Sequence, residues 1–244
     1  MNFFEFNTLC TQIFSANPLL PTIDENKSRK LYFLTEHMLE VNKHMNLTAI
    51  KEENAIILKH YADSLTISEY IPTNAKIIDI GCGAGFPTLP LAIFRPDIRI
   101  TAVDSTAKRI DYVNETAKML DLNNITAIAE RAETLGNSIE YREKFDIATA
   151  RAVASLPVLC ELCLPLVKIG GAFIAMKSQK ADEEISLSYN AIKKCGGVFT
   201  TSRECNLTNG EDIQESRTIV FITKTVSTPK EFPRHYSKIS KKPL

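Results

Sequence analysis

The sequence of 244 residues has no net charge at neutral pH and no uncharged apolar run long enough to cross a bilayer. Its longest apolar stretch, residues 152–167, is interrupted by Glu161 and by two prolines. Residues 1–5 lack the basic start and the apolar segment of a secretory signal peptide. A zero net charge provides no global field for nucleic acid, so such a partner has to be recognised locally. We expect a cytoplasmic globular protein without a membrane segment.

Paired metal-binding cysteines are also scarce. Of the six cysteines, only Cys160 and Cys163 have the spacing of zinc ligands, and no second pair completes such a site. Both lie in a helical pattern of leucines. We therefore expect buried free thiols and no metal site, which fits a reducing compartment.

Helical periodicity dominates residues 1–72, where apolar residues at helical spacing predict two long helices and a third near residues 56–67. We expect Thr22 and Glu25 to form a capping box before the second helix. The segment Asn46–Thr48 is expected to cap the third helix. Because 72 residues are few for a self-sufficient core, we interpret this segment as a helical cap on the domain that follows.

From residue 76 onward, short β-rich runs alternate with helical segments, which is typical of a parallel sheet with helices on both faces. Two further strand-like runs, 197–206 and 216–225, have no helix between them and are expected to form an antiparallel hairpin. The sequence thus predicts an α/β fold with a doubly wound, mostly parallel sheet over residues 73–228, followed by a tail, 229–244. The expected parallel strands lie near 76–80, 98–103, 125–129, 145–150 and 171–176, and the expected helices near 88–94, 106–120, 155–167 and 181–194.

The most informative motif follows the first expected strand. The strand runs into three alternating glycines, Gly81, Gly83 and Gly85, with Phe86 directly after them. Glycine lets the backbone turn sharply and lets a ligand lie against it. A dinucleotide site requires a further glycine where Phe86 stands. The motif therefore favours an adenosyl ligand without a pyrophosphate, and it resembles the first motif of S-adenosylmethionine-dependent methyltransferases.

Polar residues mark the ends of four expected strands, where open parallel sheets bind ligands. Asp79 precedes the glycine loop, and Asp104 ends the second strand, where a carboxylate can accept hydrogen bonds from ribose hydroxyls. The third strand runs into residues 130–133, whose backbone amides or Glu133 carboxylate can meet an adenine edge. The fourth strand ends at Arg151. We predict that these residues form one cofactor site.

The segment after the fourth strand lacks two sequence features that other base methyltransferases use in catalysis. Residues 151–155 contain neither an Asn/Asp-Pro-Pro-aromatic loop, often used for exocyclic amines, nor a cysteine nucleophile, needed for carbon 5 of a pyrimidine. Guanine N7 needs neither device because it has a free lone pair and no proton to lose. Catalysis can then rest on proximity and orientation without general acid–base chemistry. The sequence assigns no catalytic residue.

His60, Asp63 and Ser64 share one face of the third expected helix. A hydrolase relay is one interpretation of this trio. Because a histidine and a serine four residues apart seldom reach relay geometry, and no strained nucleophile turn accompanies them, we expect a structural hydrogen-bond network instead.

The chain has a basic end. Residues 224–244 contain six basic side chains against Glu231, a local surplus that attracts phosphates. We expect this end to contact an RNA backbone. Because it follows the hairpin and supplies no tip of a parallel strand, we expect it to leave the cofactor site unaffected. The six are Lys224, Lys230, Arg234, Lys238, Lys241 and Lys242.

Together these residues resemble the bacterial 16S ribosomal RNA guanine-N7 methyltransferase family, also called the glucose-inhibited division protein B family. The resemblance implies a cytoplasmic, monomeric enzyme that modifies one guanine of small-subunit ribosomal RNA with S-adenosylmethionine as cofactor. Matching segments run in order through 46–50, 60–65, 79–91, 103–109, 131–133, 150–152, 232–234 and 242–244. The implied cofactor residues are Gly81, Phe86, Ala132, Glu133 and Arg151, with Asp104 on the ribose.

The chain departs from the family pattern at two positions beside the glycine loop. Cys82 stands where serine or threonine is usual, and Thr88 stands where glycine is usual. Two other functions stay open on the sequence. A small-molecule methyltransferase can use the same fold. A nicotinamide-binding oxidoreductase or a binding module is the other alternative, against which Phe86 argues.

Overall fold

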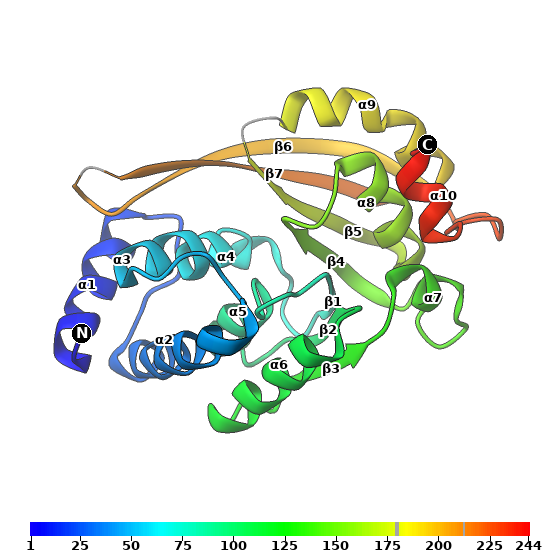
Figure 1. Cartoon of the computed structure of the whole chain (residues 1–244). Coiled ribbons are helices and arrows are strands. Elements are labelled where there is room, and N and C mark those ends of the chain that lie inside the picture. Colours follow the sequence, from blue (N-terminus) through cyan, green and yellow to red (C-terminus); the bar gives the residue numbers. More distant parts are fainter. Residues whose placement is uncertain (179–180, 212) are drawn as a thin grey trace.

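A seven-stranded sheet with the order β3-β2-β1-β4-β5-β7-β6 forms the centre of the computed structural model, which describes residues 1–178, 181–211 and 213–244 (Figure 1). Strands β1 to β5 pair in parallel, and the β6–β7 hairpin continues the sheet in antiparallel fashion. The predicted doubly wound sheet with a terminal hairpin is therefore confirmed. The strands are β1 (Lys76–Ile80), β2 (Arg99–Asp104), β3 (Ile125–Ala129), β4 (Phe145–Arg151), β5 (Val167–Lys177), β6 (Gly197–Thr208) and β7 (Gln214–Lys224).

Helices cover both faces of the sheet (Figure 1). The helices of the first half of the chain lie on one face, and the later helices lie on the other. A π-helix, η1 (Ile57–Ala62), lies between two short helices of the first face, and two 3₁₀ turns occur at Ser68–Tyr70 and Leu164–Leu166. The first face carries α1 (Phe3–Ala16), α2 (Glu25–Met45), α3 (Glu53–Ile56), α4 (Asp63–Leu65), α5 (Thr88–Phe94) and α6 (Ala107–Met119). The second carries α7 (Ala132–Asn137), α8 (Leu156–Cys163), α9 (Ala181–Lys194) and α10 (Tyr236–Lys241).

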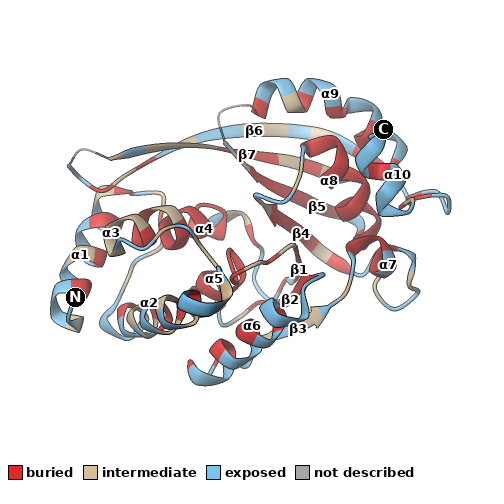
Figure 2. Cartoon of the chain, in the orientation of Figure 1, coloured by how far each residue is buried: buried red, intermediate tan, exposed pale blue. Residues whose placement is uncertain are grey.

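One hydrophobic core lies on each face of the sheet, and the central strands between the two cores are buried along most of their length (Figure 2). Ile77 of β1 belongs to the cluster under α1–α6, whereas its neighbour Ile78 belongs to the cluster under α7–α10. Successive strand residues point to opposite faces, so a parallel strand covered on both sides reads as a continuous apolar run. This explains why β1 appears in the sequence as an uninterrupted hydrophobic segment.

The N-terminal helices share a core with the sheet. Phe6, Leu31 and Leu34 are fully buried in the same cluster as Ile77 and Ile100. A side-chain clamp joins the other end of the sheet to α1, because Asn17 bonds both backbone groups of Thr208 at 2.7 and 2.9 Å. We therefore propose that residues 1–72 fold with the sheet as one cooperative unit.

Both predicted helix caps are wrong. The N-cap of α2 is Asp24, whose carboxylate accepts a hydrogen bond from the Lys27 amide at 2.8 Å, so Thr22 lies outside the helix start. Asn46 ends α2 with a left-handed φ of 52°, a conformation that asparagine tolerates, and α3 begins only at Glu53. Capping residues occur at helix ends and in turns alike, so their type alone does not fix a boundary.

The six-residue helices α7 and α10 did not appear in the sequence prediction, because six residues are too few to display a periodic pattern. No helix of the described ranges is both long and apolar enough to span a membrane.

Replacing Leu34 with alanine tests the shared core. Leu34→Ala removes a fully buried side chain and is expected to lower the free energy of unfolding by about 2–5 kcal/mol. Chemical denaturation followed by circular dichroism should still show one transition. Leu187→Ala on the exposed face of α9 is the control and should change stability by less than about 0.5 kcal/mol. Two separate transitions in either protein would contradict a common cooperative unit.

Candidate active site

The glycine loop lies directly after β1 and is shaped by glycine-only conformations. Gly81, Gly83 and Gly85 have φ values of 72°, 56° and 85°. A Cβ at Gly81 would lie 2.4 Å from Val153, and one at Gly85 would lie 2.4 Å from Leu89, so both glycines allow close packing. At Gly83 the space is open, because the nearest atom would be 3.9 Å away. The loop therefore packs tightly at its two ends and leaves its centre accessible.

Asp104 joins the glycine loop to the end of β2. Its Oδ2 atom accepts a hydrogen bond from the Gly83 amide at 3.1 Å, and its Oδ1 atom accepts one from the Thr106 amide at 2.8 Å. Arg109 approaches Oδ2 at 3.4 Å. A carboxylate has about four lone-pair sites, so acceptor capacity remains for hydroxyl groups of a ligand. Asp104 thus has a structural role that the sequence did not reveal, beside the predicted ribose contact.

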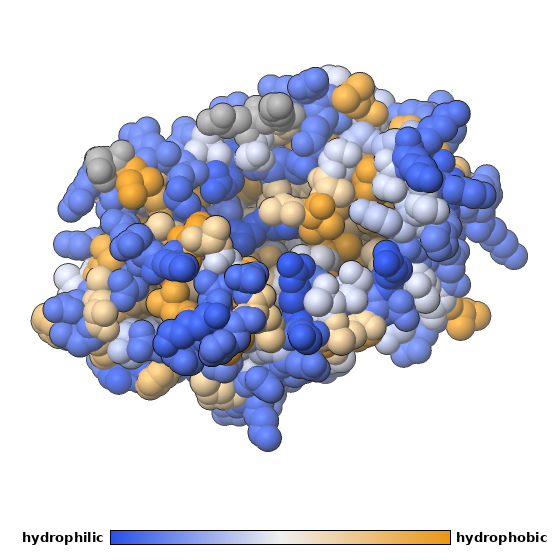
Figure 3. Space-filling model, in the orientation of Figure 1, coloured by the Kyte–Doolittle hydropathy of each residue, from blue (hydrophilic) through white to orange (hydrophobic). Residues whose placement is uncertain are grey.

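A pocket of about 300 Å³ opens beyond the carboxyl ends of β1 to β4, at the lower end of the range for small-molecule sites. On the side of the molecule shown in Figure 3, hydrophilic side chains predominate and the surface is hollowed near its centre. The pocket residues are Ile80, Gly81, Val103, Asp104, Ser105, Arg109, Glu130, Arg131, Ala132, Glu133, Ala152, Val153, Leu162 and Tyr236. Four of the predicted cofactor residues are thereby brought together: Gly81, Asp104, Ala132 and Glu133.

Glu133 supplies the observation that best tests whether the pocket fits an adenosyl group. Its side chain is 7% exposed, and within the described parts of the chain its Oε1 atom has no hydrogen-bond partner. A buried acceptor without a partner is costly and normally has an explanation. An adenine amino group is a donor of the right kind. The acceptors present in the pocket, Asp104 and Glu133, thus have the chemistry that an adenosyl group would need.

Other backbone features of the pocket were not predicted. Ala152, directly after β4, has a left-handed φ of 56°, which is uncommon for a residue other than glycine. This turn places Val153 over Gly81. Neither feature leaves a mark in the sequence, because alanine and valine are ordinary residues for a loop or a helix start.

Asp79 lies beneath the loop and is not a pocket residue. It is 1% exposed and accepts hydrogen bonds from Thr88 Oγ1 at 2.7 Å and from Thr149 Oγ1 at 2.9 Å. Burial raises the pKa of this carboxyl group to about 6, although the two hydroxyl groups oppose the shift. Thr88, the departure from the family pattern, therefore supplies a hydrogen bond that glycine does not have.

His60 packs against Phe86, the residue that follows the glycine loop. The two rings stack with centroids 4.5 Å apart, and His60 Nε2 bonds Thr48 Oγ1 at 2.9 Å. Burial, with a contribution from the nearby arginine charge of Arg151, lowers the pKa of His60 to about 3. Ser64 donates to the His60 carbonyl rather than to the imidazole. The trio is a structural network, as predicted, and His60 is neutral at physiological pH.

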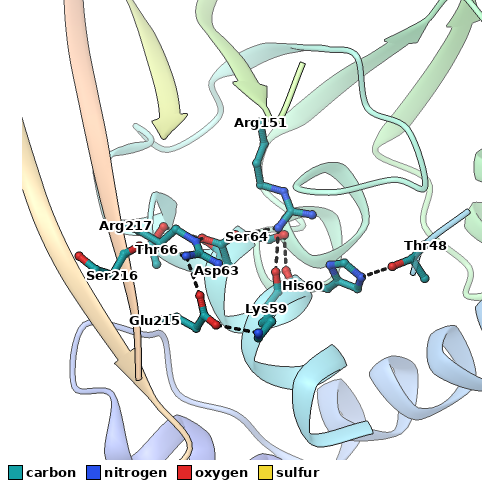
Figure 4. Close-up of polar contacts among 10 residues, drawn as sticks. All are labelled: Thr48, Lys59, His60, Asp63, Ser64, Thr66, Arg151, Glu215, Ser216 and Arg217. Carbon is teal, nitrogen blue, oxygen red and sulfur yellow. Dashed lines mark hydrogen bonds and ion pairs between the residues drawn. The ribbon is translucent and has the colours of Figure 1, made fainter. Parts of the chain in front are cut away.

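Arg151 turns away from the pocket toward the helical cap (Figure 4). Its Nη1 atom donates to Asp63 Oδ2 at 2.8 Å and to the Lys59 carbonyl at 2.9 Å. Arg217 of β7 bonds the other oxygen of Asp63 at 3.2 Å, while Lys59 forms an ion pair with Glu215 at 2.7 Å. One carboxylate thus joins the cap, the tip of β4 and the hairpin. In this arrangement Arg151 borders the site without lining it, as do Gly83, Gly85 and Phe86.

The thiols are not placed for nucleophilic chemistry. Burial raises the pKa of Cys82 well above its usual value, and Cys160 and Cys163 are free and fully buried, as expected. A reactive cysteine requires an accessible, stabilised thiolate. In the part of the chain that the structure describes, no group of three or more histidine, cysteine or acidic side chains could hold a metal ion.

The basic end of the chain differs from expectation in two ways. Lys224 is completely buried and pairs with Glu143, while Arg234 pairs with the buried Glu161, so two of the six counted charges are neutralised internally. Tyr236 lines the pocket. The segment therefore reaches the pocket, which its place after the hairpin did not indicate, because a terminal helix can reach the strand ends from outside the sheet. That its lysines leave cofactor affinity unchanged stays a prediction.

A larger, open depression of about 1100 Å³ lies at the opposite edge of the sheet, where it is bordered by residues such as Lys76, Arg99 and Asn123. It lies at the amino ends of the parallel strands. Open α/β sheets bind their ligands beyond the carboxyl ends. We therefore assign the cofactor to the smaller pocket.

Solved methyltransferases share this architecture. The structure "M. jannaschii TYW2 in complex with AdoMet" aligns with a TM-score of 0.54 at 15% identity, covering 68% of this chain and 75% of that chain. A precorrin-6y C5,15-methyltransferase from Geobacter metallireducens aligns with a TM-score of 0.51 at 14% identity, covering 74% and 92%. At such identities the likeness concerns the fold. The chain therefore has the class I, Rossmann-like fold of S-adenosylmethionine-dependent methyltransferases.

Sequence comparison narrows this class to one family. The family model GidB, "rRNA small subunit methyltransferase G", matches residues 27–213. A protein of Lactobacillus acidophilus named "Ribosomal RNA small subunit methyltransferase G" is 42% identical over 226 residues, 91% of this chain and 92% of that protein. A protein of the same name from Bacillus licheniformis is 45% identical over 212 residues, 86% and 87% of the two chains. The chain belongs to the GidB family, as its motifs predicted.

The open centre of the loop gives a prediction at Gly83. In Gly83→Ala the new methyl group meets no protein atom, but it occupies the accessible side of the loop. We expect S-adenosylmethionine affinity to fall at least about tenfold and stability to fall by about 1–2 kcal/mol, the cost of a left-handed alanine. Gly170→Ala is a matched control, because Gly170 also has a positive φ and open space but lies in β5. Calorimetry showing equal cofactor affinity in both variants would exclude the loop from the site.

The raised pKa of Asp79 predicts a pH-dependent stability. Folding favours the protonated form, so the stability present below pH ~4 is lost as pH rises through about 6. Asp79→Asn stays neutral and should exceed the wild type in stability at pH 8 by up to about 3 kcal/mol, with a smaller difference at pH 5. Urea unfolding at the two pH values measures this, with the exposed Asp111→Asn as control. A pH-independent difference would mean that Asp79 is ionised without penalty.

Proposed function

We propose that the protein transfers the methyl group of S-adenosylmethionine to N7 of a guanine in small-subunit ribosomal RNA. The choice of N7 as the methylated atom rests on three titratable side chains beside the glycine loop. His60 is neutral and packed on Phe86, Asp79 is buried beneath the loop, and Cys82 is a buried thiol with a raised pKa. None of the three is arranged to remove a proton from a base or to attack one. A methyl acceptor that needs neither deprotonation nor a protein nucleophile, such as guanine N7, is therefore favoured.

The chemistry is a direct displacement that balances without a protein base. When bound, S-adenosylmethionine supplies a methyl group on a positively charged sulfur. The N7 lone pair forms the new bond to the methyl carbon while the sulfur–carbon bond breaks. Sulfur becomes neutral, the guanine ring becomes positively charged, and no proton is transferred. The work left to the protein is to hold N7, carbon and sulfur in line.

Four residues of the pocket would hold the cofactor. Gly81 gives close backbone approach, Asp104 accepts ribose hydroxyl groups, and Ala132 with Glu133 meets the base. We propose that Arg151 and Phe86 border the methyl-bearing end, where the nucleotide enters. The strand-end position of Arg151 and the stacking of Phe86 on His60 support this placement.

The RNA-facing surface is proposed to include the exposed lysines of the C-terminal segment. Lys230, Lys238, Lys241 and Lys242 are exposed, so their charges remain available to phosphates. We also propose that the enzyme works as a monomer in the cytoplasm, as the family resemblance of its motifs implies.

The proposal is tested by methylation of small ribosomal subunits from cells that lack this gene. The purified protein and S-adenosylmethionine should introduce one methyl group per subunit, recovered as N7-methylguanosine when the digested RNA is analysed by mass spectrometry. Gly83→Ala should lose the activity, whereas Gly170→Ala should retain it. A methyl group on another guanine atom would overturn the N7 assignment. Labelling of a small molecule but not of RNA would favour a small-molecule methyltransferase.

A further inference from the structure

The C-terminal segment, residues 229–244, is built into the second face of the sheet. Phe232 and Ile239 are buried in the same cluster as the apolar residues of α8 and α9. Asn137 of α7 donates a hydrogen bond to the Pro233 carbonyl at 3.1 Å. Pro233 also lies so close to Gly136 that a Cβ there would meet the proline ring at 2.8 Å. The path of the segment is therefore fixed before it reaches the pocket.

An ion pair anchors the segment immediately before α10. Arg234 holds both carboxylate oxygens of Glu161 through its guanidinium group, at 2.8 and 2.6 Å, and its backbone amide bonds the same group at 2.9 Å. Glu161 of α8 is 0% exposed. A buried carboxylate is strongly destabilising without its partner, so this contact firmly locates the start of α10.

The anchored helix places an aromatic ring at the pocket. Tyr236, the first residue of α10, lines the pocket together with Asp104 and Glu133, and 37% of its surface is exposed. Its ring lies 5.9 Å from the guanidinium carbon of Arg131, another pocket residue. Tyr236 is exposed and lies outside both core clusters, so its ring remains accessible to a ligand in the pocket. An aromatic ring beside a site for a nucleoside offers a stacking surface for the base.

The same helix also carries cations. Lys238 and Lys241 are exposed on α10, whereas Ile239 between them is buried. The helix therefore presents Tyr236 to the pocket, Ile239 to the core and both lysines to solvent. Because α10 has only six residues, a contact at the lysines and a contact at Tyr236 act on one short rigid element.

We propose that Tyr236 is a wall of the adenosyl pocket and that α10 couples cofactor binding to RNA binding, with Lys238 and Lys241 as phosphate contacts. This inference rests on the proposed function, because it takes an adenosyl cofactor and an RNA substrate as the two ligands. Coupling of this kind is reciprocal, so RNA bound at the lysines raises cofactor affinity by the same factor as the cofactor raises RNA affinity. The cofactor would be held best when the substrate is also present.

The first experiment measures the affinity of S-adenosylhomocysteine by calorimetry. Tyr236→Ala should weaken binding about tenfold, the loss of one stacked base contact, while Tyr236→Phe should bind within about twofold of the wild type. Tyr189→Ala, an exposed tyrosine of α9, is the control and should leave affinity unchanged. If Tyr236→Ala binds S-adenosylhomocysteine with wild-type affinity, Tyr236 is not a wall of the adenosyl pocket. A wild-type protein that does not bind S-adenosylhomocysteine would instead refute the proposed function.

The second experiment repeats the measurement in the presence of small ribosomal subunits from cells that lack this gene. The wild type should gain affinity by about fivefold or more, which is typical of allosteric coupling. Lys238→Ala/Lys241→Ala should lose most of this gain. The coupling is overturned if subunits do not change the wild-type affinity, or if the gain is as large in the lysine variant.

Discussion

The carboxylate of Asp104 is the contact on which the site depends most. It accepts one backbone hydrogen bond from the glycine loop after β1 and another from the turn after β2. Two loops that belong to different strands are thereby held in one geometry before any ligand arrives. Preorganisation of this kind lowers the ordering cost of binding. Asp104 can orient a ribose because its own position is already fixed by the backbone.

A second carboxylate, Asp63, has the corresponding role on the side of the cap. Arg151 from β4 and Arg217 from β7 each bond one of its oxygens. The helical cap, the parallel sheet and the antiparallel hairpin therefore meet at a single buried group. The cap thus serves the site as well as the core, because it holds the tip of β4 beside Phe86.

The sheet was predictable because each strand is a short apolar run bounded by turns, and because the glycine loop requires both its strand and its helix. The observed β1, β3, α5 and α9 match the predicted ranges residue for residue. The pocket was predictable where a residue directly follows a strand end, as with Gly81, Asp104 and Glu133. The burial of Asp79 beneath Thr88 could not be predicted. An acidic residue at a strand end has the same sequence pattern whether its side chain faces a ligand or the protein interior.

The contribution of Tyr236 was beyond sequence reasoning for a different reason. It depends on the ion pair between Arg234 and Glu161, two residues that lie 73 positions apart, and Glu161 looks like an interruption of an apolar stretch. A pairing across such a separation leaves no periodic pattern. The basic residues around Tyr236 indicated a contact with an RNA backbone, and nothing in their pattern showed that an ion pair and two apolar side chains dock the segment.

The π-helix η1 decides how the cap can absorb a change in chain length. Its wider turns hold one more residue than an α-helix of the same rise, and they occur directly before Asp63. Deleting one residue between Ile57 and Ala62 would therefore restore a regular α-helix with nearly the same rise and rotation, and Asp63 would keep its direction toward both arginines. The same deletion within a regular helix such as α2 would rotate all that follows by roughly 100°. A homologous chain that keeps this triad can accordingly be one residue shorter in this segment.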